Sequence, residues 1–260
     1  MHFKALLMIS TLLFSYPAVA ETTDAEFERQ NDTAKAAMLS DDFATALKIW
    51  QPYADRGNKR AQNNLGMMYL DGLGVEKDWD KAKALFEQSA AQGLPQAQYQ
   101  LGLMLFFGKN GLSYGRDADH KPVLDEQTRS NMDKALKLFE QSAEQGFPLA
   151  QRELADMYYL GEPTFPTSDK AKALYWYEKA AEQKEPISMG MAASLLLEGD
   201  GVARNCEKGL DWLNKAMDAG DFESHLVMAN MYQTGHTCVK ADPDKAQEVM
   251  RKIDELRQNN

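Results

Sequence analysis

Apolar side chains recur along the chain with the spacing of an amphipathic helix. In five segments, positions +4, +7 and +8 from an opening small residue are apolar, position +5 is Gly or Ala, and position +11 is Gly. The segments begin at Ala61, Ala97, Ala150, Ser188 and Ser224, at spacings of 36, 53, 38 and 36 residues. We expect five helices, each ended by a left-handed glycine and each approached closely by a neighbour at its small residue.

A second amphipathic segment follows each of these helices. It carries one large residue on its inner face, and the chain before the first repeat has the same feature: Trp50, Phe86, Phe139, Tyr177 and Leu213. The predicted N-caps are Asp78, Asn131, Thr167, Asn205 and Asp242, all of them residue types that accept a hydrogen bond from the first helical turn. A helix pair repeated at this period predicts a solenoid, not the core of a globular enzyme.

The complete repeat resembles the Sel1-like repeat, a relative of the tetratricopeptide repeat. The pattern AQxxLGxMYxxGxGVxxDxxKAxxxFExAAxxG is matched almost position for position from Ala61 to Gly93, and Gly199 to Val202 reproduce its loop. The resemblance covers residues 40 to 258 and implies an all-α, right-handed α/α solenoid of helix-turn-helix repeats. The family serves scaffolds, signalling regulators and inhibitors of other proteins.

The repeat boundaries predict an organisation in seven parts. These are a signal peptide at 1–20, an N-terminal capping helix pair at 21–57, and repeats at 58–93, 94–146, 147–184, 185–220 and 221–260, the last with the C-terminal cap. The second repeat contains a loop insertion at 109–130.

The first residues have the form of a cleavable secretory signal. Lys4 precedes the apolar run from Ala5 to Phe14, and Ala18-Val19-Ala20 is a small-x-small cleavage site. The apolar run is too short to span a bilayer. We expect a periplasmic protein with no membrane span.

Composition narrows the choice of partner. The chain has 29 basic and 39 acidic residues, a formal net charge of −10. A nucleic-acid-binding protein shows a basic stripe, and the sequence has none. We expect a monomer that needs no cofactor and binds another protein, which is a secreted effector, a sensor or an envelope enzyme. The acidic surface favours a basic partner; the alternative is that it serves solubility alone.

The two cysteines predict a disulfide. Exported proteins with an even number of cysteines commonly pair them. Cys206 follows the cap Asn205, and Cys238 lies in the equivalent loop of the next repeat. Equivalent loops of adjacent repeats lie side by side in a solenoid, so we expect a Cys206–Cys238 bridge that fastens the last repeat to its neighbour.

The insertion at 109–130 is one candidate binding element, because long loops in compact domains are often functional. Its candidate contact residues are Tyr114, Arg116 and His120. The alternative is a tolerated insertion without a role. Asp117, Asp119 and His120 lack a further ligand and a fixed scaffold, so we predict no metal site.

The second candidate is a stripe on the first helices, at positions +2, +6 and +9 of the repeat. We expect it to line the concave surface and to bind a helix or loop of another protein. The alternative is that neighbouring repeats bury these side chains. The predicted contact residues are Met67, Leu70, Tyr99, Leu103, Phe106, Arg152, Asp156 and Tyr159.

The sequence does not favour an enzyme. It has no Ser-x-x-Lys, G-x-S-x-G or H-E-x-x-H motif. We therefore expect a non-catalytic protein–protein interaction module with no catalytic residues. One alternative is an immunity protein that neutralises a secreted antibacterial effector such as a phospholipase. A second is a β-lactam-binding or β-lactam-hydrolysing enzyme of the cysteine-rich Sel1 type, which would need a nucleophile with an activating base.

Overall fold

The computed structural model describes residues 18–109, 115–116, 122–161 and 168–258. In these residues the chain forms twelve α-helices and one two-stranded antiparallel ribbon, in which Gly115–Arg116 (β1) pairs with Pro122–Val123 (β2). The helices are α1 (Ala18–Leu39), α2 (Phe43–Asp55), α3 (Lys59–Asp71), α4 (Trp79–Ala91), α5 (Pro95–Phe107), α6 (Glu126–Glu144), α7 (Pro148–Leu160), α8 (Lys170–Ala181), α9 (Pro186–Glu198), α10 (Cys206–Asp218), α11 (Phe222–Thr234) and α12 (Pro243–Gln258).

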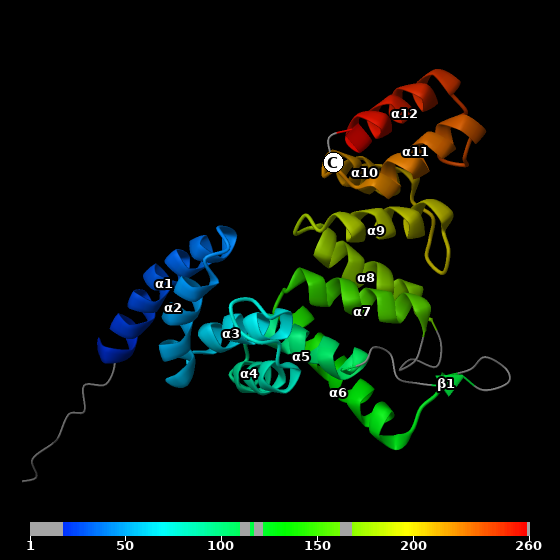
Figure 1. Cartoon of the computed structure of the whole chain (residues 1–260). Coiled ribbons are helices and arrows are strands. Elements are labelled where there is room, and N and C mark those ends of the chain that lie inside the picture. The colour runs from blue at the N-terminus through cyan, green and yellow to red at the C-terminus, as the bar shows by residue number, and fades with distance from the viewer. Residues whose placement is uncertain (1–17, 110–114, 117–121, 162–167, 259–260) are drawn as a thin grey trace, which may run out of the picture.

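The helices pack as six consecutive pairs, from α1 with α2 to α11 with α12. Each second helix also packs against the first helix of the next pair. The stack follows a curved path that brings α1–α2 and the C-terminal pairs to either side of an open space (Figure 1). This arrangement confirms the all-α solenoid that the repeat predicts.

The large residue of each second helix closes its pair. Phe86, Phe139 and Tyr177 are fully buried, and Leu213 and Trp50 are nearly so. The indole Nε1 of Trp50 donates a hydrogen bond to Oδ1 of Asn31 over 2.9 Å, which joins α2 to α1. The five residues therefore pack as core, as the sequence predicts.

Most helix starts lie where the sequence places them. The side chains of Asp78, Asn205 and Asp242 accept hydrogen bonds from backbone N–H groups three residues later. The glycines that follow α3, α5, α7, α9 and α11 all have positive φ, from 66° to 80°. Gly72, Gly161 and Gly199 are left-handed as predicted. The prediction is wrong for Gly108 and Gly235, whose ψ values of −179° and 154° are extended.

Two predicted N-caps are wrong. Helix α6 begins after Asp125, whose carboxylate accepts from Thr128 N over 2.6 Å, so Asn131 lies inside the helix. No helix-breaking residue separates the two positions, and the earlier cap therefore adds a turn and a half and shortens the insertion. Helix α8 is capped by Asp169, and Thr167 lies outside the described residues.

Buried glutamines join the two helices of a pair at one edge of the solenoid. The sequence analysis did not predict this feature. Gln62, Gln98 and Gln151 lie at position +1 of the first helices and are at most 6% exposed. Their Oε1 atoms accept from the amides of Gln92, Gln145 and Gln183, at 2.7 to 2.8 Å. Each bond ties the end of a second helix to its own first helix, which satisfies a buried polar group.

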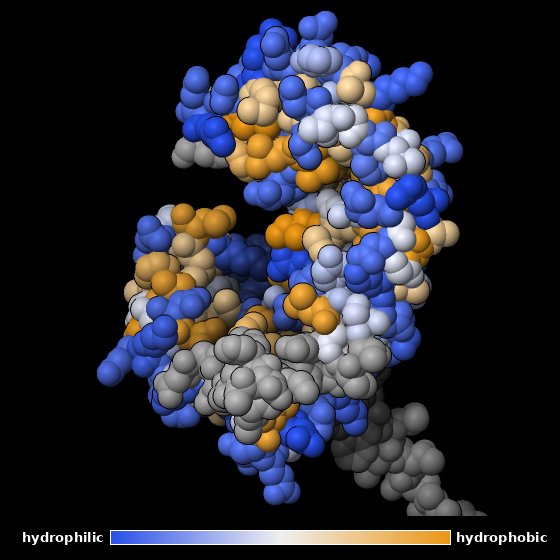
Figure 2. Space-filling model, turned by 90° about the vertical axis from the view of Figure 1, so that its right-hand side faces the viewer, coloured by the Kyte–Doolittle hydropathy of each residue, from blue (hydrophilic) through white to orange (hydrophobic). Residues whose placement is uncertain are grey.

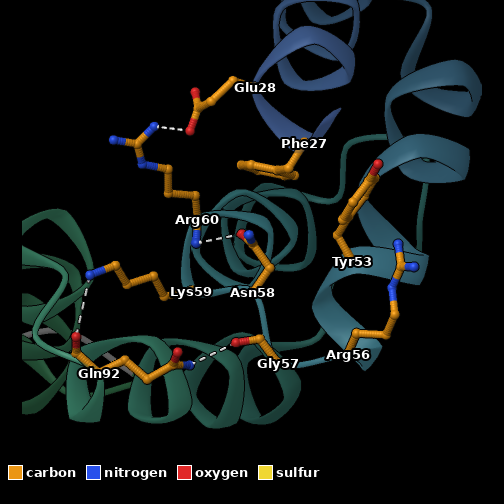
Figure 3. Close-up of a pocket in the computed structure, with 9 residues that line it drawn as sticks. All are labelled: Phe27, Glu28, Tyr53, Arg56, Gly57, Asn58, Lys59, Arg60 and Gln92. Carbon is orange, nitrogen blue, oxygen red and sulfur yellow. Dashed lines mark hydrogen bonds and ion pairs between the residues drawn. The ribbon is translucent and has the colours of Figure 1, made fainter. Parts of the chain in front are cut away.

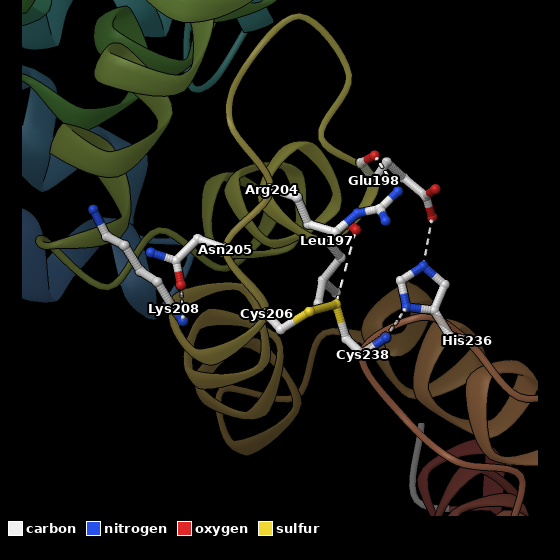
Figure 4. The surroundings of a disulfide bond; sticks show 8 residues. All are labelled: Leu197, Glu198, Arg204, Asn205, Cys206, Lys208, His236 and Cys238. Atoms are coloured by element: carbon white, nitrogen blue, oxygen red, sulfur yellow. Dashed lines mark hydrogen bonds and ion pairs between the residues drawn. A yellow bond between two sulfur atoms is a disulfide. The ribbon is translucent and has the colours of Figure 1, made fainter.

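Cys206 and Cys238 form a disulfide with a Cα–Cα distance of 5.2 Å (Figure 4). Cys206 is the first residue of α10, and Cys238 lies in the loop between α11 and α12. Nδ1 of His236 accepts from Cys238 N over 3.1 Å. The bridge therefore links the last helix pair to the preceding one.

Candidate functional site

The predicted contact residues on the first helices, here called the first-helix stripe, lie on α3, α5 and α7. They are more buried than the sequence analysis assumed. Tyr99 is only 7% exposed, and its ring lies 6.0 Å from that of Phe139 and 5.4 Å from that of Phe147. Its predicted place outside the core is therefore wrong, because α6 and the start of α7 cover it.

The other members of the first-helix stripe are half-buried. Met67 and Leu70 pack against the core between α4 and α5, and Leu103 and Phe106 pack against the core between α6 and α7. Half-buried side chains still present part of their surface to solvent. The space-filling view shows a deep hollow in the molecule, bordered by both hydrophobic and hydrophilic residues (Figure 2).

The part of the first-helix stripe on α7, near the middle of the solenoid, is charged. Arg152 Nη1 lies 3.6 Å from Glu185 Oε1, and these side chains are 23% and 10% exposed. Tyr177 donates a hydrogen bond from its hydroxyl to Asp156 Oδ1 over 2.5 Å. Together with Glu153, these residues form a group that we call the central charged cluster. It joins α7, α8 and the start of α9.

Burial dominates the electrostatics of this cluster. It raises the pKa of Glu153, and the neighbouring charge of Asp156 raises it further. Burial also raises the pKa of Asp156, although the hydrogen bond from Tyr177 and the charge of Arg152 oppose the shift. The pKa of Tyr177 is raised strongly by burial and by Asp156. The cluster thus contains three carboxyl groups and one guanidinium, all of them at least partly shielded from water.

Glu153, Tyr177 and Glu185 were not predicted as site residues. Glu153 neighbours the stripe on α7, Tyr177 belongs to the core face of α8, and Glu185 caps α9 through a hydrogen bond to Ser188 N. Tyr177 stands where the other second helices carry Trp50, Phe86, Phe139 and Leu213, and its hydroxyl was the available signal.

The insertion is described only in part. Tyr114, Asp117, Asp119 and His120 lie outside the described residues. Arg116 is in β1, where its Cα partner is Pro122. The structure therefore leaves the predicted loop contacts as predictions.

The two histidines within the described residues have structural contacts. His225 is buried, with Nδ1 2.8 Å from the Asp221 carbonyl oxygen, and His236 Nε2 lies 3.5 Å from Glu198 Oε1. In the described part of the chain, no three His, Cys, Asp or Glu side chains are grouped as a metal site would require. Over the same residues, no helix combines the length and apolarity of a membrane span.

The Sel1 repeat family matches residues 59–94, 95–119, 125–147, 148–185, 186–221 and 223–248. The second and third of these segments fall on the two halves of one helix pair, α5 and α6. The match covers well over half of the chain.

Sequence comparison finds a relative of this chain. An uncharacterized protein of Neisseria meningitidis is 28% identical over 208 residues, which are 75% of this chain and 44% of that protein. The chain thus spans less than half of that relative's length.

Two solved structures show the same fold. A protective antigen of uropathogenic Escherichia coli superimposes with a TM-score of 0.71 at 28% identity, covering 93% of this chain and 48% of the antigen. An immunity protein of Pseudomonas aeruginosa superimposes with a TM-score of 0.55 at 17% identity, covering 88% of this chain and 82% of its own. Sel1 repeats mediate protein–protein interactions, and this chain belongs to the Sel1 repeat family.

Proposed function

We propose that the protein is a non-catalytic periplasmic module that binds a partner protein across the first-helix stripe, with the insertion after α5 as a second contact. The observation that carries the proposal is the central charged cluster. Positions +2 and +6 hold Arg152 and Asp156 in this repeat, but Tyr99 and Leu103 in the one before. Burying charged side chains lowers the free energy of unfolding. The neighbouring repeat folds without them, so folding does not require these charges.

The charge of the cluster favours a basic contact residue on the partner. Glu185 pairs with Arg152, and the charge of the same guanidinium acts on Glu153 and Asp156. A lysine or arginine of the partner would supply the missing positive charge and form charge-assisted hydrogen bonds. The net charge of −10 would speed the capture of such a partner.

A second candidate is an immunity protein that binds a secreted effector, such as a phospholipase, one to one. Two observations favour it: the signal-like first 20 residues and the fold shared with Pseudomonas aeruginosa immunity proteins over 88% of this chain. The likeness is one of fold. An effector encoded beside this gene, whose toxicity in the periplasm is relieved by co-expression of this protein, would support the immunity role.

The β-lactam alternative gains no support from the cysteines. Cys206 and Cys238 are paired in the disulfide, so neither is available as a thiolate nucleophile. The function proposed for the protein is therefore the non-catalytic one.

Capture of the partner with paired variants tests the proposal. Leu70→Glu places a charge on the half-buried stripe, whereas Leu39→Glu makes the same change at a side chain that is 90% exposed at the end of α1. A single stoichiometric partner should be retained by Leu39→Glu and lost by Leu70→Glu, with both variants folded by circular dichroism. Because Leu70→Glu disturbs packing, Asp156→Asn serves as a milder second variant. Equal retention by all three proteins would contradict the proposal.

A further inference from the structure

A groove near the N-terminus carries a charge opposite to that of the whole chain. Two hollows of 610 and 550 Å³ share Lys59 and Arg60 and lie where α1, the start of α3 and the end of α4 meet. Figure 3 shows the residues that line the first of them. Arg56 and Lys35 complete the set of cations along the hollows, and among the described residues Glu28 is the one carboxylate that lines them. We call this surface the basic groove.

The floor of the basic groove is rigid and aromatic. Phe27 and Tyr53 are 1% and 8% exposed, and their ring centroids lie 5.0 Å apart. The guanidinium carbon of Arg56 lies 4.5 Å from the Tyr53 ring centroid, a cation–π distance. The contact with Tyr53 places the exposed guanidinium of Arg56 beside this floor.

Arg56 and Lys59 have nitrogen atoms that can still donate hydrogen bonds to a ligand. Arg56 donates from Nε to the Pro52 carbonyl oxygen over 3.1 Å, and within the described residues its terminal nitrogens make no hydrogen bond. Lys59 has one long contact, 3.5 Å from Nζ to the Gln92 carbonyl oxygen. The start of α3 adds the positive end of a helix dipole.

An ion pair within the chain shows that a carboxylate fits the basic groove. Glu28 and Arg60 form an ion pair across the groove, with both side chains about half exposed. A carboxylate from the chain itself thus occupies one cationic position. Carboxylates of another protein would compete for Arg60 and find Arg56 and Lys59 beside it.

We infer that the basic groove binds an acidic, extended segment of a partner protein; this inference rests on the proposed function. At physiological ionic strength charges are screened beyond about 8 Å, so a short segment senses the local cations and not the distant acidic surface. A nucleic acid or an anionic membrane presents a long polyanion, which a chain of net charge −10 would repel beyond the groove. Asn63 and Asn64, which line the second hollow and are partly exposed, carry amide groups that can bond to peptide groups.

The groove and the central charged cluster differ in sign. A partner that contacts both would therefore carry an acidic segment beside a basic one, and this would fix its direction along the solenoid. Electrostatic complementarity of this kind sets register and specificity more than affinity.

The test uses a fluorescein-labelled 12-residue peptide with Glu at alternate positions, and its Gln counterpart, in anisotropy titrations with the purified protein. We expect the Glu peptide to bind at least about tenfold more tightly than the Gln peptide, and this difference to shrink as salt is added. The variant Arg56→Glu with Lys59→Glu should abolish the difference. The control Lys48→Glu with Lys252→Glu changes the net charge equally at exposed positions of α2 and α12 and should preserve it.

Three outcomes would overturn the inference: equal binding of both peptides, equal loss in both double variants, or tighter binding of a 12-nucleotide single strand or of phosphatidylglycerol vesicles than of the Glu peptide. The result is separable from the proposed function. Loss of the peptide with Arg56→Glu and Lys59→Glu, combined with partner capture unaffected by Leu70→Glu, would keep the groove and reject the first-helix stripe.

Discussion

Gly66 lies directly against the ring of Phe86: a Cβ at this glycine would be 2.9 Å from Phe86 Cε1. The next repeat has the same relationship, with a Cβ at Gly102 only 2.6 Å from Phe139 Cε1. Glycine in a helix costs about 1 kcal/mol relative to alanine. These two repeats accept that cost because the large ring of the second helix occupies the space of a methyl group.

Gly102→Ala should therefore lower the free energy of unfolding, against the usual trend for helical glycines. The gain of about 1 kcal/mol in propensity is outweighed by overpacking of about 1–3 kcal/mol. Urea denaturation followed by circular dichroism measures the difference. Adding Phe139→Leu should make the alanine less harmful than it is alone. A Gly102→Ala protein more stable than the parent would show that Phe139 moves freely and that the close approach is not required.

The disulfide should stabilise mainly the last helix pair. Replacing Cys206 and Cys238 by serine frees a loop with a sequence separation of 32 residues, for which the chain-entropy description gives about 3–4 kcal/mol. Terminal repeats have a neighbour on one side only, so the loss should appear as faster hydrogen exchange in α11 and α12. Uniformly faster exchange from α3 to α12 would indicate instead that the solenoid unfolds as one unit. Two titratable thiols in the unfolded, unreduced parent would contradict the bridge itself.

Asp156→Asn should make stability less dependent on pH. The folded-state pKa values of Asp156 and Glu153 are raised above their ordinary values of 3.8 and 4.5. In the pH window between the unfolded and folded values the folded state binds more protons, so stability falls as pH rises through it. The amide cannot ionise but can still accept from Tyr177. The variant should equal or exceed the parent in stability at neutral pH and show a flatter profile from pH 4 to 7. A steeper profile would show that the ionised Asp156 stabilises the fold.

The fold was predictable because its signals repeat. The small residue at +5 and the large residue of the second helix follow from helix periodicity and close packing, and they lie as predicted. The +11 glycines end their helices as predicted, but only Gly72, Gly161 and Gly199 are left-handed. The start of α6 was not predictable from the repeat, since Asp125 is an equally good cap upstream of Asn131 and lies within the insertion.

The candidate site was harder to predict from the sequence than the fold. Helix periodicity identifies the face on which Tyr99 lies, but not that Phe139 and Phe147 cover it. The contacts of Arg152 with Glu185, and of Asp156 with Tyr177, cross between helices whose relative rotation the repeat does not specify. Three of the four cations of the basic groove, Arg56, Lys59 and Arg60, are close together in the sequence. The hollows that they line form only where α1 and the end of α4 approach them, and this approach cannot be derived from the repeat.

Hydrogen–deuterium exchange of the protein with and without its captured partner tests the central claim most directly. Binding across the first-helix stripe predicts protection in α3, α5 and α7, with α4, α6 and α8 nearly unchanged, because the partner covers the first helices and not the second. Protection confined to the second helices, or to α11 and α12, would contradict the assignment of the first-helix stripe as the binding surface.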